Sequence, residues 1–294
     1  MRFRTNAKIN LFLRVLGDRP DGFHEIETIL HSVDLGDEME ISVRSGSGIE
    51  VEMILEDGVR GPAPPPRANL IYWAAERMLE LSGSSAAIRV VTRKRIPMGG
   101  GLGGGSANAA GALVALNEML GVGLDVEDLG RLGAAIGSDV PFCISGGTAL
   151  ATSRGEVLTA LPATARLWFV LGMSRDPVQT HEVYARWRPS QESPLVDRSQ
   201  VTSAVGAGNP VEIAPLLLND LEPYIFELRP DVRSGTQWLV KAGALGSLTS
   251  GSGPTVFGIA SNEAHAQAIA DQARGEFDRV QVVGSRPEGV ERLD

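Results

Sequence analysis

The sequence is poor in cysteine, in long apolar runs and in excess positive charge. It holds 1 cysteine in 294 residues, Cys143, which excludes an internal disulfide and a cysteine-rich metal site. Its apolar runs, such as residues 167–173, are far too short to span a bilayer, and residues 1–4 lack a signal-peptide core. A net charge of -9 argues against general nucleic-acid binding. We therefore expect a cytoplasmic protein that binds neither nucleic acid nor a membrane.

Length and composition favour an ordinary globular protein with two domains. Hydrophobic residues make up 43% and charged residues 21% of the chain, and 294 residues can bury a substantial core. A strand pattern at residues 146–151 and a turn at 153–156 close the first half, and the pattern restarts at residue 157. We therefore expect one domain over residues 1–156 and a second over residues 157–294.

The most informative stretch is a glycine-rich loop that joins a strand pattern at residues 88–92 to a helical pattern at 109–120. Glycine has no Cβ, so its backbone can adopt positive φ and approach a ligand closely. The free N–H groups and the positive dipole end of the following helix suit a phosphate chain. A flexible hinge rarely ends on an alanine-rich helix, so we predict a phosphate-binding loop made of Pro97, Met98, Gly99, Gly100, Gly101, Leu102, Gly103, Gly104, Gly105, Ser106 and Asn108.

Other phosphate loops fit this stretch less well. Gly99, Gly101 and Gly104 satisfy G-x-G-x-x-G, and Asp125 lies about twenty residues further on, as in a dinucleotide-binding oxidoreductase. However, Asp125 precedes a helical pattern at 126–136 as an N-cap instead of ending a second strand. A Walker A loop is excluded because no Gly-Lys-Ser or Gly-Lys-Thr follows the glycines.

The loop resembles the P-x-x-x-G-L-G-S/G-S/G-S signature of the galactokinase, homoserine kinase, mevalonate kinase and phosphomevalonate kinase (GHMP) superfamily. Its extra glycines most closely resemble those of the 4-diphosphocytidyl-2-C-methyl-D-erythritol kinases. The resemblance implies an α+β, two-domain architecture, with an N-terminal ribosomal-protein-S5-like domain and a C-terminal ferredoxin-like α/β sandwich. It implies ATP-dependent phosphorylation, with Mg²⁺, of the 2-hydroxyl of 4-diphosphocytidyl-2-C-methyl-D-erythritol in isoprenoid precursor synthesis. The metal ligands are not predicted.

A strand pattern near the N-terminus places polar groups in an apolar setting. One predicted face carries Ile9, Leu11 and Leu13, and the other carries Lys8, Asn10 and Phe12. A lone Lys on a strand is usually a solvated edge charge, but Lys8 beside Asn10 favours a site. The string Ala-Lys-Ile-Asn-Leu-Phe-Leu also resembles the first motif of the diphosphocytidyl-methylerythritol kinases.

Asp139 follows the glycine stop at the end of the predicted helix 126–136. By itself it could be a turn carboxylate. Residues 137–142 resemble the family segment G-A/S-D-V-P-F, whose Asp faces the acceptor hydroxyl. The resemblance implies that Asp139 is the general base, and that Lys8 orients the hydroxyl and neutralises charge in the transition state.

A turn at residues 17–22 leads into Phe23 and His24. An aromatic ring beside an imidazole can stack on a nucleobase and hydrogen-bond to it, although a hydrophobic plug with a satisfied histidine is the simpler interpretation. The family motif R-x-D-G-Y/F-H implies that Phe23 stacks on cytosine and His24 reads its edge. The family also implies that Tyr184 supplies the second face. His31 and His265 are predicted to be structural.

Several residues are weaker candidates for the ATP site. Asn69 is predicted to cap a helix over residues 70–81, and the family places an Asn-Leu pair, here Asn69 and Leu70, beside adenine. Lys94 corresponds to a family lysine near the nucleotide. Arg93 and Arg95 beside it can add positive field next to the phosphate loop, although a solvated strand end is the simpler interpretation.

A second glycine cluster contains Ser250, Gly251, Ser252 and Gly253 and joins two strand patterns. It resembles the third superfamily motif, which packs against the phosphate loop, although alone it would be a tight turn. A helix at 262–274 and a strand at 279–283 are predicted to complete the second domain. Residues 60–67 and 189–210 are predicted to be surface connections, and residues 219–222 to be helical.

The expected partners are ATP and a small cytidine diphosphate acceptor, in a monomer or weak homodimer. Three alternatives remain open. They are another GHMP alcohol kinase of the homoserine or mevalonate type, a dinucleotide-binding oxidoreductase, and a catalytically silent nucleotide-binding protein on the same fold.

Overall fold

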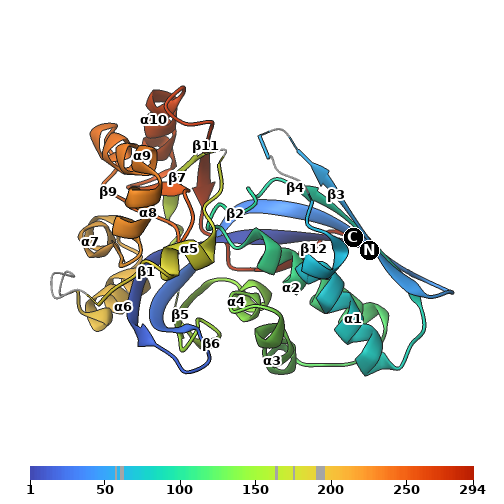
Figure 1. The fold of residues 1–294 in the computed structure, drawn as a ribbon. Coiled ribbons are helices and arrows are strands. Elements are labelled where there is room, and N and C mark those ends of the chain that lie inside the picture. The colour runs from blue at the N-terminus through green and yellow to red at the C-terminus, as the bar shows by residue number, and fades with distance from the viewer. Residues whose placement is uncertain (57, 60–62, 163–164, 175, 190–195) are drawn as a thin grey trace.

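A computed structural model of the chain describes residues 1–56, 58–59, 63–162, 165–174, 176–189 and 196–294. Within these residues the strands form an 8-stranded sheet and a 4-stranded sheet, each carrying helices (Figure 1). The fold is therefore α+β, as predicted. None of the described helices combines the length and apolarity that crossing a bilayer requires.

The larger sheet is built on two long strands, β1 (Arg2–Asp18) and β2 (His24–Arg44). Its order is β12-β1-β2-β4-β3, with β5 and β6 attached to β2 and with β8 attached to β1. The other strands are β3 (Gly48–Leu55), β4 (Ala87–Lys94), β5 (Thr148–Thr152), β6 (Val157–Ala160), β8 (Leu218–Asn219) and β12 (Val290–Arg292).

Three helices pack against this sheet and a fourth packs on those helices (Figure 1). The three are α1 (Leu70–Ser82), α2 (Gly104–Met119) and α4 (Val140–Ser145), and the fourth is α3 (Val126–Ile136). Helix α2 lies against β1 and β2, and small buried residues such as Ala110 and Gly111 allow this approach. A Cβ on Gly111 would lie 2.5 Å from the side chain of Thr5, so this close packing requires glycine.

The smaller sheet has the strand order β11-β7-β10-β9 and is wholly antiparallel. Its strands are β7 (Trp168–Met173), β9 (Gly246–Thr249), β10 (Val256–Ala260) and β11 (Arg279–Gly284). The helices between β7 and β9 are α5 (Thr180–Tyr184), α6 (Arg198–Ala207), α7 (Pro210–Ile213), α8 (Glu222–Leu228) and α9 (Pro230–Lys241), and α10 (Glu263–Ala273) joins β10 to β11. This β-α-β-β-α-β order is ferredoxin-like.

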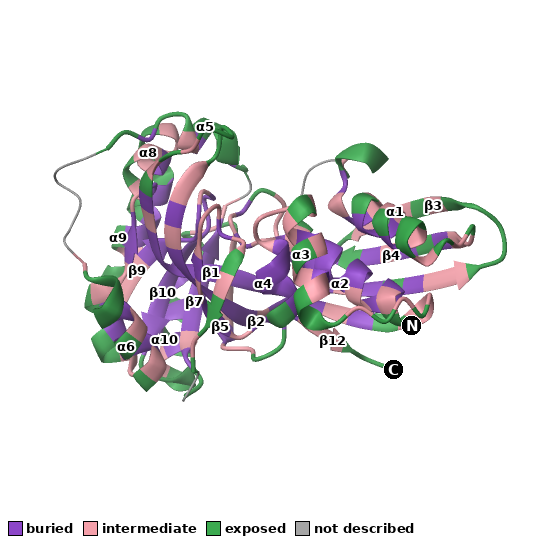
Figure 2. Ribbon diagram, turned by 90° about the horizontal axis from the view of Figure 1, so that it is seen from below, coloured by how far each residue is buried: buried purple, intermediate pink, exposed green. Residues whose placement is uncertain are grey.

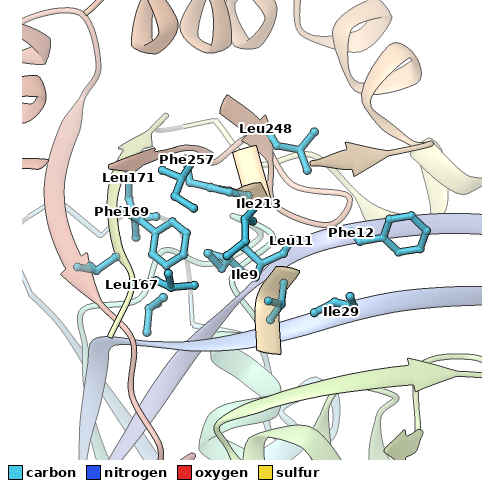
Figure 3. Close-up of a cluster of buried hydrophobic side chains, with 14 of the residues drawn as sticks. Ile9, Leu11, Phe12, Ile29, Leu167, Phe169, Leu171, Ile213, Leu248 and Phe257 are labelled. Atoms are coloured by element: carbon cyan, nitrogen blue, oxygen red, sulfur yellow. The ribbon is translucent and has the colours of Figure 1, made fainter. Parts of the chain in front are cut away.

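The two sheets share a hydrophobic core, so the halves of the chain are not separate bodies. Ile9 and Leu11 of β1 join one buried cluster with Phe169 of β7 and Phe257 of β10 (Figure 3). Figure 2 shows buried residues gathered where β1 meets β7 and β10, and again along α2 and α4. The strands β6, β8 and β12, which follow residue 156, complete the larger sheet. A boundary at residue 156 stays a prediction.

The predicted faces of the N-terminal strand are wrong beyond Asn10, where Phe12 and Leu13 exchange sides. Phe12 belongs to the same buried cluster as Ile9 and Leu11, whereas Leu13 lies in another cluster and lines a cavity with Lys8 and Asn10. The cause is a register shift between Asn10 and Phe12 in the pairing of β1 with β2. An extra residue in one strand exchanges the faces of all residues that follow it.

Capping residues marked the starts of three helices correctly. The side chains of Asn69, Asp125 and Asn262 accept hydrogen bonds from backbone N–H groups in the first turns of α1, α3 and α10, respectively. These caps confirm the predicted starts of the three helices. His31 and His265 are structural, as predicted, because His31 is buried between Thr148 and Ser285 and His265 hydrogen-bonds to Ser261.

Several predicted connections are more regular than expected. The segment 189–210 contains α6, and the segment 60–67 runs into the short 3-10 helix Pro66–Ala68. Residues 60–62 and 190–195 lie outside the described part of the chain. Asn219 ends strand β8 instead of lying in a helix, because it pairs with Leu13 of β1. The predicted turn at Asp139 is followed at once by the short helix α4.

Candidate active site

A cavity of about 1080 Å³ lies where β1, the glycine loop, the start of α4, and α5 come together. It gathers nearly all of the predicted site residues, although they are spread over most of the chain. Those that line it are Lys8, Asn10, Phe23, His24, Asn69, Leu70, Lys94, Pro97, Met98, Gly99, Gly100, Gly101, Leu102, Gly103, Gly104, Gly105, Ser106, Asn108, Asp139, Tyr184, Gly251 and Ser252. Ser250 and Gly253 do not line the cavity, but both contact Gly101, which does.

The glycine loop has the backbone conformation that its composition predicts. Gly99, Gly101 and Gly103 have φ angles of 67°, 81° and 70°, a region that favours glycine. Helix α2 begins at Gly104, and its N-cap residue Gly103 makes no side-chain capping hydrogen bond. The first N–H groups of the helix therefore face the cavity without a capping side chain, where they can donate to an anion.

The two glycine clusters pack directly against each other, as the sequence predicts. Ser250 Oγ donates to the carbonyl oxygen of Gly101 at 2.9 Å. The backbone N–H of Thr255 donates to the carbonyl oxygen of Gly100 at 3.3 Å. A Cβ on Gly101 would lie 2.0 Å from the carbonyl oxygen of Ser250 and 2.8 Å from Gly253. No other residue type fits here, so the contact fixes the shape of the phosphate loop.

Lys8 and Asp139, which come from separate motifs, meet in the cavity. Lys8 Nζ lies 3.5 Å from Asp139 Oδ2. The same ammonium donates to Asn10 Oδ1 at 2.8 Å and to the carbonyl oxygen of Gly101 at 3.1 Å. The side chain of Lys8 is 6% exposed and that of Asp139 is 33% exposed. A carboxylate open to the cavity beside a buried cation can accept a proton from a bound hydroxyl.

Aromatic rings gather around His24 and Tyr184, which both line the cavity, and we call this part of its wall the aromatic end. The centroid of the His24 ring lies 4.9 Å from that of Tyr184, with an angle of 42° between the rings. It also lies 5.7 Å from the ring centroid of Trp187, in an edge-on contact. His24 Nε2 lies 3.1 Å from Asp18 Oδ1. Burial, with a smaller contribution from Asp139, raises the pKa of the Tyr184 hydroxyl, which therefore stays protonated.

Phe23 is placed differently from Tyr184. Its side chain is 49% exposed at the cavity edge, and the guanidinium of Arg154 lies 4.8 Å from its ring centroid. The ring of Tyr184 therefore contacts the ring of His24, whereas the ring of Phe23 contacts the guanidinium of Arg154. A base stacked on Phe23 would use the ring face that Arg154 leaves open.

Lys94 and Asn108 line the cavity, but their polar atoms are committed to a buried cluster beneath the loop. Lys94 Nζ forms an ion pair with Asp37 and donates to Asn108 Oδ1 at 2.9 Å. Asn108 Nδ2 donates to Asp37 and to Thr5, each at 2.9 Å. Asp37 also accepts from the backbone N–H groups of Arg95 and Ile96. The cluster ties the segment before the glycine loop to the helix after it.

The flanking arginines take part in surface ion pairs. Arg93 lies 4.0 Å from Glu56, and Arg95 lies 2.9 Å from Glu38. Neither arginine lines the cavity. Asn69 donates its amide to Met53 Sδ at 3.6 Å and caps α1, so its side chain is used structurally while it lines the cavity.

Sequence reasoning missed several cavity and support residues. Thr28 and Arg154 line the cavity, and Thr180 Oγ1 lies 2.8 Å from Ser252 Oγ across its edge. Asn219, whose segment borders the site in relatives of the family, donates from Nδ2 to the carbonyl oxygen of Gly251 at 2.8 Å and so holds the second glycine cluster. Thr28 could have been found by the same pattern that pointed to Lys8, namely a polar residue inside an otherwise apolar strand. Within the described residues no group of three or more His, Cys, Asp or Glu side chains could hold a metal.

Comparison with known proteins agrees with this geometry. The family model of the GHMP kinases N terminal domain matches residues 69–147, and that of the GHMP kinases C terminal domain matches residues 201–279. The 4-diphosphocytidyl-2-C-methyl-D-erythritol kinase of Gloeobacter violaceus is 42% identical over 94% of this chain and 91% of its own length. The chain belongs to the GHMP kinases.

Further relatives of this GHMP kinase include the 4-diphosphocytidyl-2-C-methyl-D-erythritol kinase of Pelotomaculum thermopropionicum, which is 41% identical over 95% of both chains. A crystal structure of 4-(cytidine 5'-diphospho)-2C-methyl-D-erythritol kinase superposes with a TM-score of 0.81 at 32% identity and covers 97% of this chain and 99% of its own. A homoserine kinase from Cytophaga hutchinsonii, at 24% identity and a TM-score of 0.74, shares the fold.

Membership of the family makes the protein a small-molecule kinase with ATP as cosubstrate. The dinucleotide-binding oxidoreductase is thereby wrong as an alternative. Its glycine spacing was a coincidence, because the loop precedes α2 of a GHMP kinase fold and Asp125 caps α3.

Proposed function

We propose that this GHMP kinase transfers the γ-phosphoryl group of ATP to the 2-hydroxyl of 4-diphosphocytidyl-2-C-methyl-D-erythritol, a step in the methylerythritol phosphate route to isoprenoid precursors. The observation that carries the proposal is 42% and 41% identity, over 94% and 95% of the chain, to two kinases named for that acceptor. The cavity supports it, because the phosphate loop, the pair of Lys8 and Asp139, and the aromatic end line one and the same cavity.

In this proposal Asp139 accepts the proton of the acceptor hydroxyl as its oxygen attacks the γ-phosphorus. Lys8 orients that hydroxyl and offsets the negative charge that grows in the transition state. The N–H groups at the start of α2 bind the ATP phosphates, and the closely packed cluster at Ser250 to Gly253 keeps the loop in place. Phe23 and Tyr184 stack on the cytosine, and His24 reads its edge.

The donor set of the cavity fits Mg²⁺. The oxygen donors of its lining include the Ser106 hydroxyl and the Asp139 carboxylate. Mg²⁺ is usually held by one or two protein oxygens together with substrate phosphates. Bound in this way, the ion would neutralise charge on the phosphates, while the proton transfer stays with Asp139.

A product assay with ATP and Mg²⁺ tests the proposal. The panel of acceptors is 4-diphosphocytidyl-2-C-methyl-D-erythritol, 2-C-methyl-D-erythritol 4-phosphate, homoserine and mevalonate. We expect efficient phosphorylation of the cytidine compound alone, because only that acceptor fills the aromatic end. Equal kcat/KM for one of the other three would favour an alcohol kinase of another type. Absence of any phosphorylated product would favour the catalytically silent protein.

The remaining features of the proposal are a cytoplasmic location and a monomer or weak homodimer without nucleic-acid or membrane partners. The single cysteine supports the location, and the net charge of -9 supports the absence of a nucleic-acid partner. Sedimentation of the purified protein at several concentrations measures the oligomeric state.

A further inference from the structure

Thr28 of β2 is a buried hydroxyl in the wall of the cavity that the proposed proton transfer does not use. The residue is 1% exposed. Its Oγ1 lies 2.6 Å from the carbonyl oxygen of Phe12 and 2.8 Å from Asn10 Nδ2. Both contacts are within hydrogen-bonding distance, so the hydroxyl joins two groups of β1.

The chemistry of these groups fixes the direction of each hydrogen bond. A carbonyl oxygen only accepts, so the single hydrogen of the Thr28 hydroxyl is directed to Phe12. Thr28 can then only accept from Asn10, which must present its NH₂ group on this side. The Asn10 oxygen therefore faces the opposite side, where Lys8 Nζ, which only donates, lies at 2.8 Å. Both ends of the chain of hydrogen bonds require the same amide orientation.

This orientation helps to place the Lys8 ammonium. Of its three hydrogens, one is directed to Asn10 Oδ1 and one to the carbonyl oxygen of Gly101 at 3.1 Å. The third is left for the side on which Asp139 lies at 3.5 Å. If the Asn10 amide turned over, its NH₂ group would face the ammonium and push it from this position.

A bulge in β1 makes the arrangement possible. The pairing of β1 with β2 changes register between Asn10 and Phe12, so Thr28 pairs with Leu13 while it bonds to both of the earlier residues. Bulges bend a strand and re-aim its side chains, and they are frequent beside active sites.

We infer that Thr28 is a positioning residue for phosphoryl transfer. Its hydroxyl fixes the orientation of the Asn10 amide, which holds Lys8 beside Asp139. The inference rests on the proposed roles of Lys8 and Asp139, and it adds to them the residue that sets their geometry. Thr28 itself makes no contact with the phosphate loop and acts through Asn10 and Lys8, so its effect falls on kcat more than on ATP binding.

The test compares Thr28→Val, which keeps the shape but removes the hydroxyl, with Thr28→Ser, which keeps the hydroxyl. We expect Thr28→Val to lower kcat about 10-fold, because it leaves a buried amide donor unpaired beside Lys8. The KM for ATP should stay within about 2-fold of the native value, and Thr28→Ser should keep kcat within about 3-fold. Thr28→Ala gives the same comparison in case the valine variant does not fold.

A double variant separates positioning from a general structural role. In an Asn10→Ala background, adding Thr28→Val should change kcat by less than about 2-fold, because the group through which Thr28 acts is gone. A further 10-fold loss in that background, or a native kcat for Thr28→Val, would overturn the inference. The proposed function fails separately, if the native enzyme does not phosphorylate the cytidine compound. The same variants, assayed with whichever alcohol is phosphorylated, then still test Thr28.

Discussion

Gly101→Ala should uncouple the two glycine clusters while leaving the rest of the fold intact. Gly101 has a φ of 81°, and the left-handed region costs an L-residue about 1–2 kcal/mol. The added Cβ would also lie 2.0 Å from the carbonyl oxygen of Ser250, an overlap that the loops can relieve only by separating. Overpacking of this kind costs about 1–3 kcal/mol, so the combined penalty is at least about 2 kcal/mol.

The phosphate loop must return to its present shape to bind ATP, so this penalty should appear in the dissociation constant. A penalty of about 2 kcal/mol weakens ATP about 30-fold. Turnover should fall as well, because the carbonyl oxygen of Gly101 accepts from Lys8 Nζ at 3.1 Å. Calorimetric titration with ATP measures the affinity, and steady-state kinetics with saturating ATP measure the turnover.

Gly83→Ala is the matched control for the backbone penalty. Gly83 ends α1 with a φ of 63°, and no atom lies within 4 Å of the position of an added Cβ. This variant should lose about 1 kcal/mol of stability and bind ATP as the native protein does. If Gly101→Ala bound ATP within about 3-fold of the native affinity, the contact between the two glycine clusters would not shape the phosphate site.

Three further predictions concern the chemistry, the acceptor and the pH dependence of stability. Asp139→Asn should lower turnover about 100-fold or more with ATP affinity retained, because a general base contributes about that much; near-native turnover would exclude the role. Phe23→Ala and Tyr184→Ala should each raise the KM of the cytidine acceptor about 5- to 150-fold without changing that of ATP, since stacking on an aromatic is worth about 1–3 kcal/mol; an equal change for both substrates would indicate misfolding instead. Burial lowers the pKa of His31 from 6.5 to about 4, so the unfolded chain binds more protons between these values and the stability is lost as the pH falls from 6.5 toward 4. The loss should reach about 3 kcal/mol in urea unfolding and be smaller in His31→Gln, whereas equal pH profiles of the two proteins would contradict it.

The sequence alone determined the features that depend on neighbouring residues. The glycines before α2 predicted positive φ because other residue types are strained there, and Gly99, Gly101 and Gly103 have it. Asn69 and Asp125 predicted helix starts because a cap bonds to residues two or three positions further on. These interactions join residues that are close together in the sequence, so the sequence itself shows which residues make them.

The resemblance of several separate motifs to those of one family extended the prediction to the fold and the family, because the order of the motifs along the chain is itself sequence information. The predicted surface connection at 189–210 shows the limit of the local signals. Helix α6 carries few apolar residues, and those it has, such as Val201 and Val205, pack into the core between the sheets. Its stability therefore comes from packing, which the local pattern does not contain.

Only the tertiary structure decided which atoms of the site meet. It placed Lys8 beside Asp139, turned Lys94 and Asn108 toward Asp37, and set the ring of His24 against that of Tyr184. A bulge in β1 also places Phe12 in the core, on the face opposite to the predicted one. Each of these outcomes depends on strand register and on the approach of distant segments. A shift of one residue in a strand exchanges its faces, and the alternation of the sequence cannot reveal where such a shift occurs.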